Sequence, residues 1–208
     1  MANDDQVNAL GGLRPLTQPY GTFKRSYYRL TTAADAVYIG QPVDLDGNGQ
    51  AVRCGAGTAA SLYILGPVVG FSRDSRGQMG LPDAMSVITA AGFLPGATDA
   101  YVCIADDPNQ EFIIQEANSG TALTTADIGN NCGFMYIRSA SGSTLTGSSF
   151  AELYPPFLTA ASNATLRVVG LADNMNSDGT YNSLGGYAKW RVRINTHRLN
   201  AVLPGAVV

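Results

Sequence analysis

The chain has 208 residues, enough for one domain of ordinary size or two small ones with a buried core. Only 14% of the residues are charged, 45% are hydrophobic, and the net charge is −3. This composition excludes a disordered chain and argues against direct binding of DNA or RNA, which needs clustered basic residues. The 13 basic residues are scattered instead, with small groups at Lys24 and Arg25 and around Arg191.

The sequence contains no apolar run close to the roughly 18 residues that a membrane-spanning helix needs. It starts with a polar, acidic stretch that lacks the apolar segment of a secretory signal. We therefore expect no membrane partner and synthesis in a cytoplasm. The three cysteines, Cys54, Cys103 and Cys132, lack CxxC spacing, so we expect them to be reduced core residues.

Residues 1–25 are predicted to form an extended N-terminal arm, because prolines and glycines interrupt any helical or alternating period there. Residues 26–208 contain short apolar or alternating runs separated by turn residues, which predicts a β-rich body. The predicted strands are 27–30, 36–45, 51–54, 62–72, 85–89, 100–104, 111–116, 133–138, 149–153, 165–173 and 187–199.

The last run, 187–199, is the clearest strand, since polar residues such as Arg191 and Arg193 alternate with apolar ones such as Trp190 and Val192. Between two earlier strands, 46–49 reads Asp-Gly-Asn-Gly, which is typical of a hairpin turn. Only 124–131 suggests a short helix.

Strands without crossover helices must pair antiparallel. The predicted fold class is therefore all-β, with an antiparallel β-barrel or β-sandwich body, and the sequence does not choose between these two. The Gly-, Ser- and Thr-rich stretch 139–149 is either a loop or a seam between two lobes of the body.

The sequence offers no convincing catalytic, metal or cofactor site. The one histidine, His197, has no nucleophile motif beside it, so we expect a structural residue that is exposed or hydrogen-bonded locally. Residues 55–60 fit a loose GxGxxA pattern, but a strand-like run follows where a dinucleotide-binding fold needs a helix. Residues 174–179 imitate a calcium loop, yet Gly185 stands where the chelating glutamate belongs. We expect no cofactor and no enzymatic activity.

Several segments follow one another in an informative order. They are "GLRPL", "YIGQPVDLDGNGQAV", "LGPVVGF", "YVCIADDPNQEFIIQE", "TTADIGNN", "TLRVVGLADN" and "AKWRVRINTHRL". In this order, from about Leu13 to Leu199, the chain resembles the β-rich capsid decoration (cement) proteins of tailed bacteriophages. The resemblance lies in the succession of segments, because no single motif is diagnostic.

The resemblance implies a structural virion protein on the capsid surface, commonly a homotrimer, whose partner is the major capsid protein. It implies no catalytic residues. We predict that the arm contacts the shell through Arg14, Phe23, Lys24 and Arg25. The main alternative is a tail, collar or receptor-binding β module of the virion. The major capsid protein itself, an enzyme and a ligand-binding barrel are weaker alternatives.

Overall fold

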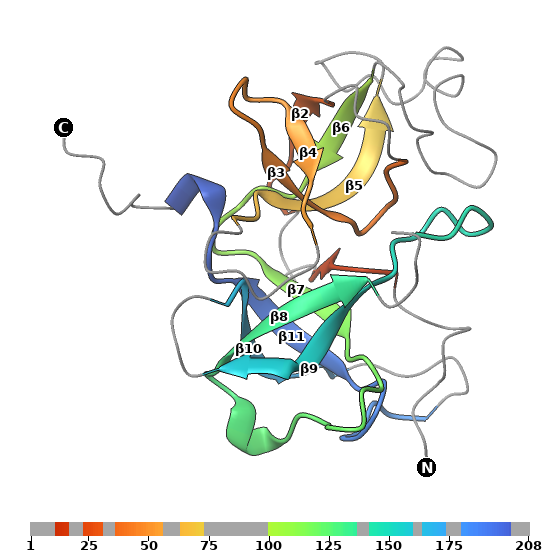
Figure 1. The fold of residues 1–208 in the computed structure, drawn as a ribbon, viewed down its shortest axis with the longest axis vertical. Helices are drawn as coiled ribbons and strands as arrows, with labels where there is room; N and C mark the ends of the chain where they lie inside the picture. Colours follow the sequence, from red (N-terminus) through yellow and green to blue (C-terminus); the bar gives the residue numbers. More distant parts are fainter. Residues whose placement is uncertain are drawn as a thin grey trace.

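The computed structural model describes residues 11–16, 23–30, 36–55, 63–72, 100–136, 142–159, 164–173 and 180–200. Within these ranges the chain forms two antiparallel β-sheets, two short 3₁₀ turns and no α-helix. Figure 1 shows the sheets as an upper and a lower lobe. The prediction of an all-β antiparallel body is confirmed. The predicted strand 85–89 and the stretch 174–179 lie outside the described residues.

The upper lobe is a five-stranded sheet in the order β2-β6-β5-β3-β4. Its strands are β2 (Ser26–Arg29), β3 (Pro42–Leu45), β4 (Ala51–Arg53), β5 (Gly66–Ser72) and β6 (Tyr101–Ile104). The predicted hairpin joins β3 to β4, and its Asp46 carboxylate accepts hydrogen bonds from the backbone N–H of Asn48 (2.8 Å) and Gln50 (2.9 Å). Leu30, directly after β2, forms a bridge to Ala51 of β4, so the sheet curls on itself without becoming a continuous barrel.

The lower lobe is a six-stranded sheet in the order β1-β7-β11-β10-β8-β9. Its strands are β1 (Arg14–Pro15), β7 (Glu111–Gln115), β8 (Asn131–Tyr136), β9 (Ala151–Thr159), β10 (Leu166–Leu171) and β11 (Lys189–Ile194). Glu116, directly after β7, forms a bridge to Leu153 of β9, so this sheet is curled in the same way. The segment 142–150 connects β8 to β9 within this one sheet.

Each sheet wraps around its own cluster of buried side chains. The upper cluster includes Val43 and Val102, which are fully buried. The lower cluster is built on Phe112, Phe134 and Trp190, which are fully buried as well. Burying an apolar side chain of this size stabilises the fold by about 1.5–3 kcal/mol, so each lobe has a substantial core of its own.

A single 3₁₀ turn, η3 (Thr125–Asp127), forms within the stretch that the sequence predicts as a short helix. The Asp127 carboxylate accepts hydrogen bonds from the backbone N–H (2.7 Å) and the hydroxyl (2.9 Å) of Thr124. Gly129 then takes a left-handed backbone conformation, with φ +93°. The helical geometry ends after one turn because Ile128, directly after η3, already has an extended backbone conformation, with φ −62° and ψ 129°.

The segment 11–16 lies at the junction of the lobes, where Figure 1 shows β1 as a short red arrow. Leu13 is fully buried in the lower cluster, and its backbone N–H donates to the Gly40 carbonyl of the upper lobe at 2.9 Å. Gly12 and Gly40 both have positive φ, and a Cβ on either would collide with the backbone of the other segment. Residues 11–16, predicted as part of an arm, therefore belong to the body, while 1–10 and 17–22 lie outside the described residues.

The end of the described chain also ties the lobes together. The N–H of Ile64 donates to the Thr196 carbonyl (3.0 Å), and the N–H of Arg198 donates to the Ile64 carbonyl (2.9 Å). The Arg198 guanidinium binds the Asp44 carboxylate through two nitrogens and lies 4.5 Å from the centre of the Tyr63 ring. These contacts fix the C-terminal segment of the lower lobe against strand β3 of the upper lobe.

Candidate interaction surface

The structure divides the four predicted anchor residues between the two sheets. Arg14 lies in β1, half-buried, and its Nη2 donates to the Ser148 hydroxyl at 3.2 Å. Burial lowers the pKa of the Arg14 guanidinium from its ordinary value. Phe23 packs against the lower core, whereas Lys24 and Arg25 are exposed just before β2 of the upper sheet. The four residues therefore do not form one patch defined by a single sheet.

A hairpin, 142–149, stands next to the N-terminal segment and projects at the right of Figure 1. At its tip, the Ser143 hydroxyl accepts hydrogen bonds from the backbone N–H of Leu145 and Thr146, each at 3.2 Å. The N–H of Ile39 donates to the Gly147 carbonyl at 2.9 Å, which fixes the hairpin to the body. Leu145 at its tip is 88% exposed, the largest exposed fraction among the described large apolar residues.

The outward side of β1, β7, β11 and β10 carries most of the basic residues of the lower lobe. Residues paired across neighbouring strands point to the same side of a sheet. Arg14 pairs with Ile113 of β7, Ile113 pairs with Arg191 of β11, and Arg191 pairs with Gly170 of β10. Arg14 and Arg191 therefore lie on one face, separated by one strand.

A second row runs beside the first, two residues away on β7 and β11 and three residues away on β10, where the register shifts between Val168 and Gly170. Glu111 of β7 pairs with Arg193 of β11, which pairs with Arg167 of β10. Arg193 donates to the Glu111 carboxylate at 2.9 Å, and Arg191 lies 3.9 Å from it. We call the set Arg14, Arg167, Arg191, Arg193, Glu111 and Ile113 the arginine face.

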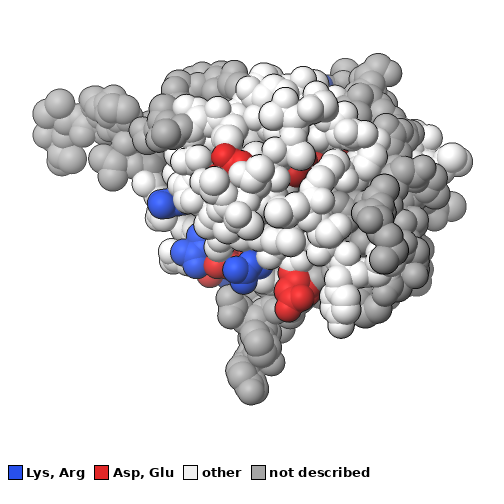
Figure 2. Space-filling view, turned by 90° about the horizontal axis from the view of Figure 1, so that it is seen from below, with Lys and Arg blue, Asp and Glu red and all other residues white. Residues whose placement is uncertain are grey.

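The arginine face holds four basic groups and one carboxylate, in a chain whose net charge is −3. Figure 2, which views the molecule from below, shows basic side chains grouped beside a carboxylate at one side of an otherwise weakly charged surface. In the sequence, Arg191 and Arg193 are recognisable only as alternating residues of one predicted strand. That Arg14 and Arg167 lie on the same face depends on which strands pair, and the sequence alone does not show this pairing.

A buried carboxyl group lies inside the lower lobe. Glu116 is fully buried, and its two oxygens accept hydrogen bonds from the Trp190 indole N–H (2.6 Å) and the Leu123 backbone N–H (3.0 Å). Burial raises the pKa of Glu116 to about 7, although both hydrogen bonds favour the charged form. Glu116 thus links β7 to β11 and to the loop before η3.

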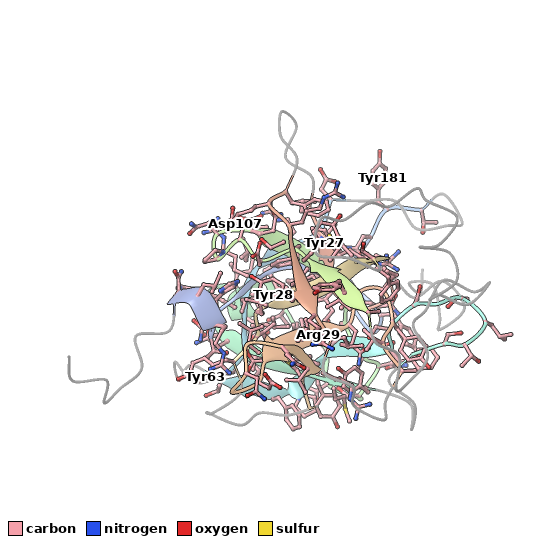
Figure 3. The ribbon with its side chains drawn as sticks, turned by 90° about the horizontal axis from the view of Figure 1, so that it is seen from above. Tyr27, Tyr28, Arg29, Tyr63, Asp107 and Tyr181 are labelled. Carbon is pink, nitrogen blue, oxygen red and sulfur yellow. The ribbon has the colours of Figure 1, made fainter. Side chains whose placement is uncertain are left out.

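The upper lobe has a second buried acidic group near the outer strand β2. The Tyr28 hydroxyl donates to the buried Asp106 carboxylate at 2.8 Å. Burial, together with the hydrogen bond to Asp106, raises the pKa of Tyr28 to about 12. Figure 3 shows Tyr27, Tyr28 and Arg29 in succession along this strand. The pair holds the edge strand to the turn that leads into the lower lobe.

The histidine and the three cysteines, which the sequence predicts to be structural residues, lie in the interior of the protein. His197 is buried, and its Nδ1 accepts a hydrogen bond from the Leu199 backbone N–H at 3.1 Å, so it is hydrogen-bonded locally. Burial lowers the pKa of His197. Cys54, Cys103 and Cys132 are free and buried, as expected.

In the described part of the chain, no group of three or more His, Cys, Asp or Glu side chains is placed to hold a metal ion. The same residues include no helix that is long and apolar enough to cross a membrane. None of the family models, curated proteins and solved structures compared with the chain matches it.

Proposed function

We propose that the protein is a capsid decoration protein, which binds the outer surface of an assembled phage head and stabilises it without catalysing a reaction. Its partner is the major capsid protein, and it acts as a homotrimer on the virion. The observation that carries the proposal is the anchoring of residues 11–16 at the junction of the lobes, through Leu13 and the pairing of β1 with β7. Whatever residues 1–10 bind is thereby coupled to a rigid body.

The segments that carry the resemblance to decoration proteins coincide with the framework of the fold. "YIGQPVDLDGNGQAV" contains the β3–β4 hairpin, and "YVCIADDPNQEFIIQE" contains β6, β7 and the connection between the sheets. "TLRVVGLADN" and "AKWRVRINTHRL" contain the paired strands β10 and β11. The resemblance thus rests on strands and turns that determine the architecture, which supports a shared design of the body.

The physical basis of such a function is mass action. A protein that binds only the assembled and expanded lattice stabilises that lattice against disassembly by RT ln(1 + [L]/Kd) per site. Residues 1–10, which we call the tether, are joined to this body and add to the stabilisation of the lattice. The second contact with the lattice forms at the effective concentration set by the first. A body whose lobes are cross-linked by Leu13, Arg198 and Asp44 loses little conformational entropy when it binds.

The test is the binding of the purified protein to expanded capsids that lack it, together with the mass of the protein in solution. We expect a trimer in solution and stoichiometric binding to the capsids. Removing residues 1–10, which leaves Leu13 and β1 in place, should reduce occupancy on the capsids strongly. The unfolding temperature of the shortened protein is measured as well, to separate a loss of binding from a loss of stability. Removing residues 201–208 at the other end is the matched control and should leave occupancy unchanged.

A monomer that ignores capsids would contradict the proposal. That result would favour the alternative of a tail, collar or receptor-binding module, which occurs in few copies per particle. Full occupancy by the protein without residues 1–10 would keep the decoration function but reject the tether.

A further inference from the structure

We propose that the arginine face is a docking surface for an acidic patch on a partner protein. The inference rests on the proposed function, in which the patch belongs to the major capsid protein, and it assigns the body's own contact with the shell. It extends the sequence-based expectation, which named residues 1–25 as a contact with the shell, by a surface of the body.

Two arginines of the arginine face lie directly opposite each other on neighbouring strands. Arg167 and Arg193 are direct cross-strand neighbours on β10 and β11, and like charges in that position destabilise a sheet. Their exposure is also high, since Arg167 is exposed and the Arg193 side chain is 51% exposed. This pair does not stabilise the folded body, whereas a carboxylate of an acidic partner would attract both guanidinium groups and offset their mutual repulsion.

The one carboxylate of the arginine face lies near two of its arginines. Glu111 pairs with Arg193 at 2.9 Å and lies 3.9 Å from Arg191, and its side chain is only 14% exposed. One carboxylate cannot neutralise two guanidinium groups, so an excess of positive charge remains on β10 and β11. Carboxylates on a partner are its natural complement, because guanidinium binds carboxylate through two parallel hydrogen bonds.

The Arg191 side chain lies close against the neighbouring strand β10. Its guanidinium lies over Gly170 of the neighbouring strand, where an added Cβ would stand 3.2 Å from Nη2. Its Nε is buried and has no hydrogen-bond partner in the described structure, while 41% of the side chain remains exposed. The guanidinium therefore lies against the sheet, while part of the Arg191 side chain is open to solvent. A pre-positioned guanidinium loses less entropy on binding than a freely moving one.

The other residues of the arginine face favour a protein over a nucleic acid as the partner. Half-buried Ile113 lies between Arg14 and Arg191 at the centre of the face, and Glu111 lies at its side. An apolar residue and a carboxylate within a small basic patch suit a mixed protein surface. A phosphate backbone would be repelled by Glu111 and by the net charge of −3.

The experiment compares single and double charge neutralisation on the two sheets. Arg167→Gln and Arg193→Gln remove exposed charges of the arginine face, and Arg29→Gln removes an exposed arginine of β2 as the matched control. Binding to expanded capsids is measured at low and high salt, and the unfolding temperature of each variant is checked. We expect each face variant to weaken capsid binding roughly five-fold, the double variant roughly 20-fold, and the control not to weaken it. The double variant should also show a weaker salt dependence than the wild type.

The outcomes separate the two proposals. Wild-type binding that survives unchanged in the double variant, at the same salt dependence, overturns the docking surface and leaves the decoration function intact. A wild-type protein that does not bind capsids overturns the decoration function and this inference with it. Salt-dependent binding of a short DNA duplex that is lost in the double variant, with capsid binding unchanged, replaces the acidic protein by a nucleic acid.

Discussion

Glu116→Gln tests the buried carboxyl of the lower lobe through the pH dependence of stability. The group's pKa is about 7 in the folded protein and close to 4.5 when it is exposed in the unfolded chain. Between these values the folded state holds a proton that the unfolded state has lost. The free energy of unfolding therefore falls as the pH rises through this window, and the contribution of Glu116 is constant above about pH 7.

The size of the effect follows from the two pKa values. One pKa unit corresponds to about 1.36 kcal/mol, so between about pH 5 and pH 8 Glu116 lowers the free energy of unfolding by about 2.5 kcal/mol. A glutamine does not titrate, and it can accept only one of the two hydrogen bonds from Trp190 and Leu123. The free energy of unfolding of the variant should thus lack the pH-dependent contribution of Glu116. It should also be lower by about 1–3 kcal/mol, because one of the two buried donors is left without an acceptor.

The assay is equilibrium unfolding in urea, followed by circular dichroism at several values between about pH 5 and pH 8. Other groups, including His197, titrate in both proteins, so the difference between wild type and variant isolates Glu116. Asp173→Asn, which removes an exposed carboxylate, is the control and should follow the wild type. An identical pH dependence in wild type and Glu116→Gln would refute the reasoning.

Two further predictions concern the junction of the lobes. Leu13→Ala should lower the free energy of unfolding by about 2–5 kcal/mol, because the side chain is fully buried in the lower core, and urea unfolding measures this. Arg198→Lys should lower the free energy of unfolding by about 1 kcal/mol in the same assay, since lysine loses the two-nitrogen contact with Asp44 and the stacking on Tyr63. An unchanged free energy would show that this partly exposed pair contributes nothing to stability.

The alternation of polar and apolar residues predicted the strongest strand well. Within 187–199 the structure has β11 at Lys189–Ile194, and Trp190, Val192 and Ile194 face the core. The predicted strand 36–45 is instead shortened to β3, since Gly40 has φ +82° and the N–H of Gln41 donates back to the Tyr38 carbonyl at 3.2 Å. A local turn of this kind interrupts the strand, although its apolar pattern continues.

The predicted strand 149–153 is longer in the structure, where β9 runs from Ala151 to Thr159. Pro155 and Pro156 argue against a strand at this point, because proline cannot donate to a neighbouring strand. β9 is an edge strand, and its pairing with β8 shifts register between Tyr154 and Thr159, so the prolines face no partner that needs their N–H. The position of β9 at the end of the strand order explains why it tolerates two prolines, and a single sequence does not show that position.

The arginine face illustrates the same limit for function. The sequence shows that Arg191 and Arg193 alternate along one strand, but Arg14 and Arg167 join them only through the pairing order β1-β7-β11-β10. The first of these pairings connects Arg14 with Ile113, 99 positions further along the chain. Hydrophobic alternation carries no information about which strands are neighbours. Register and strand order were therefore needed to recognise the face.

The boundary of the N-terminal segment decides which experiments can separate binding from folding. A deletion of residues 1–25 removes β1 and the buried Leu13, and with them the hydrogen bond to Gly40 that joins the lobes. The loss of capsid binding after such a deletion would follow from a weakened body as readily as from a missing tether. A deletion that ends before Gly11 keeps Leu13, β1 and the contacts that the structure describes for them at the junction. The contributions of the tether and of the arginine face can then be measured on the same folded body, one by deletion and the other by charge neutralisation.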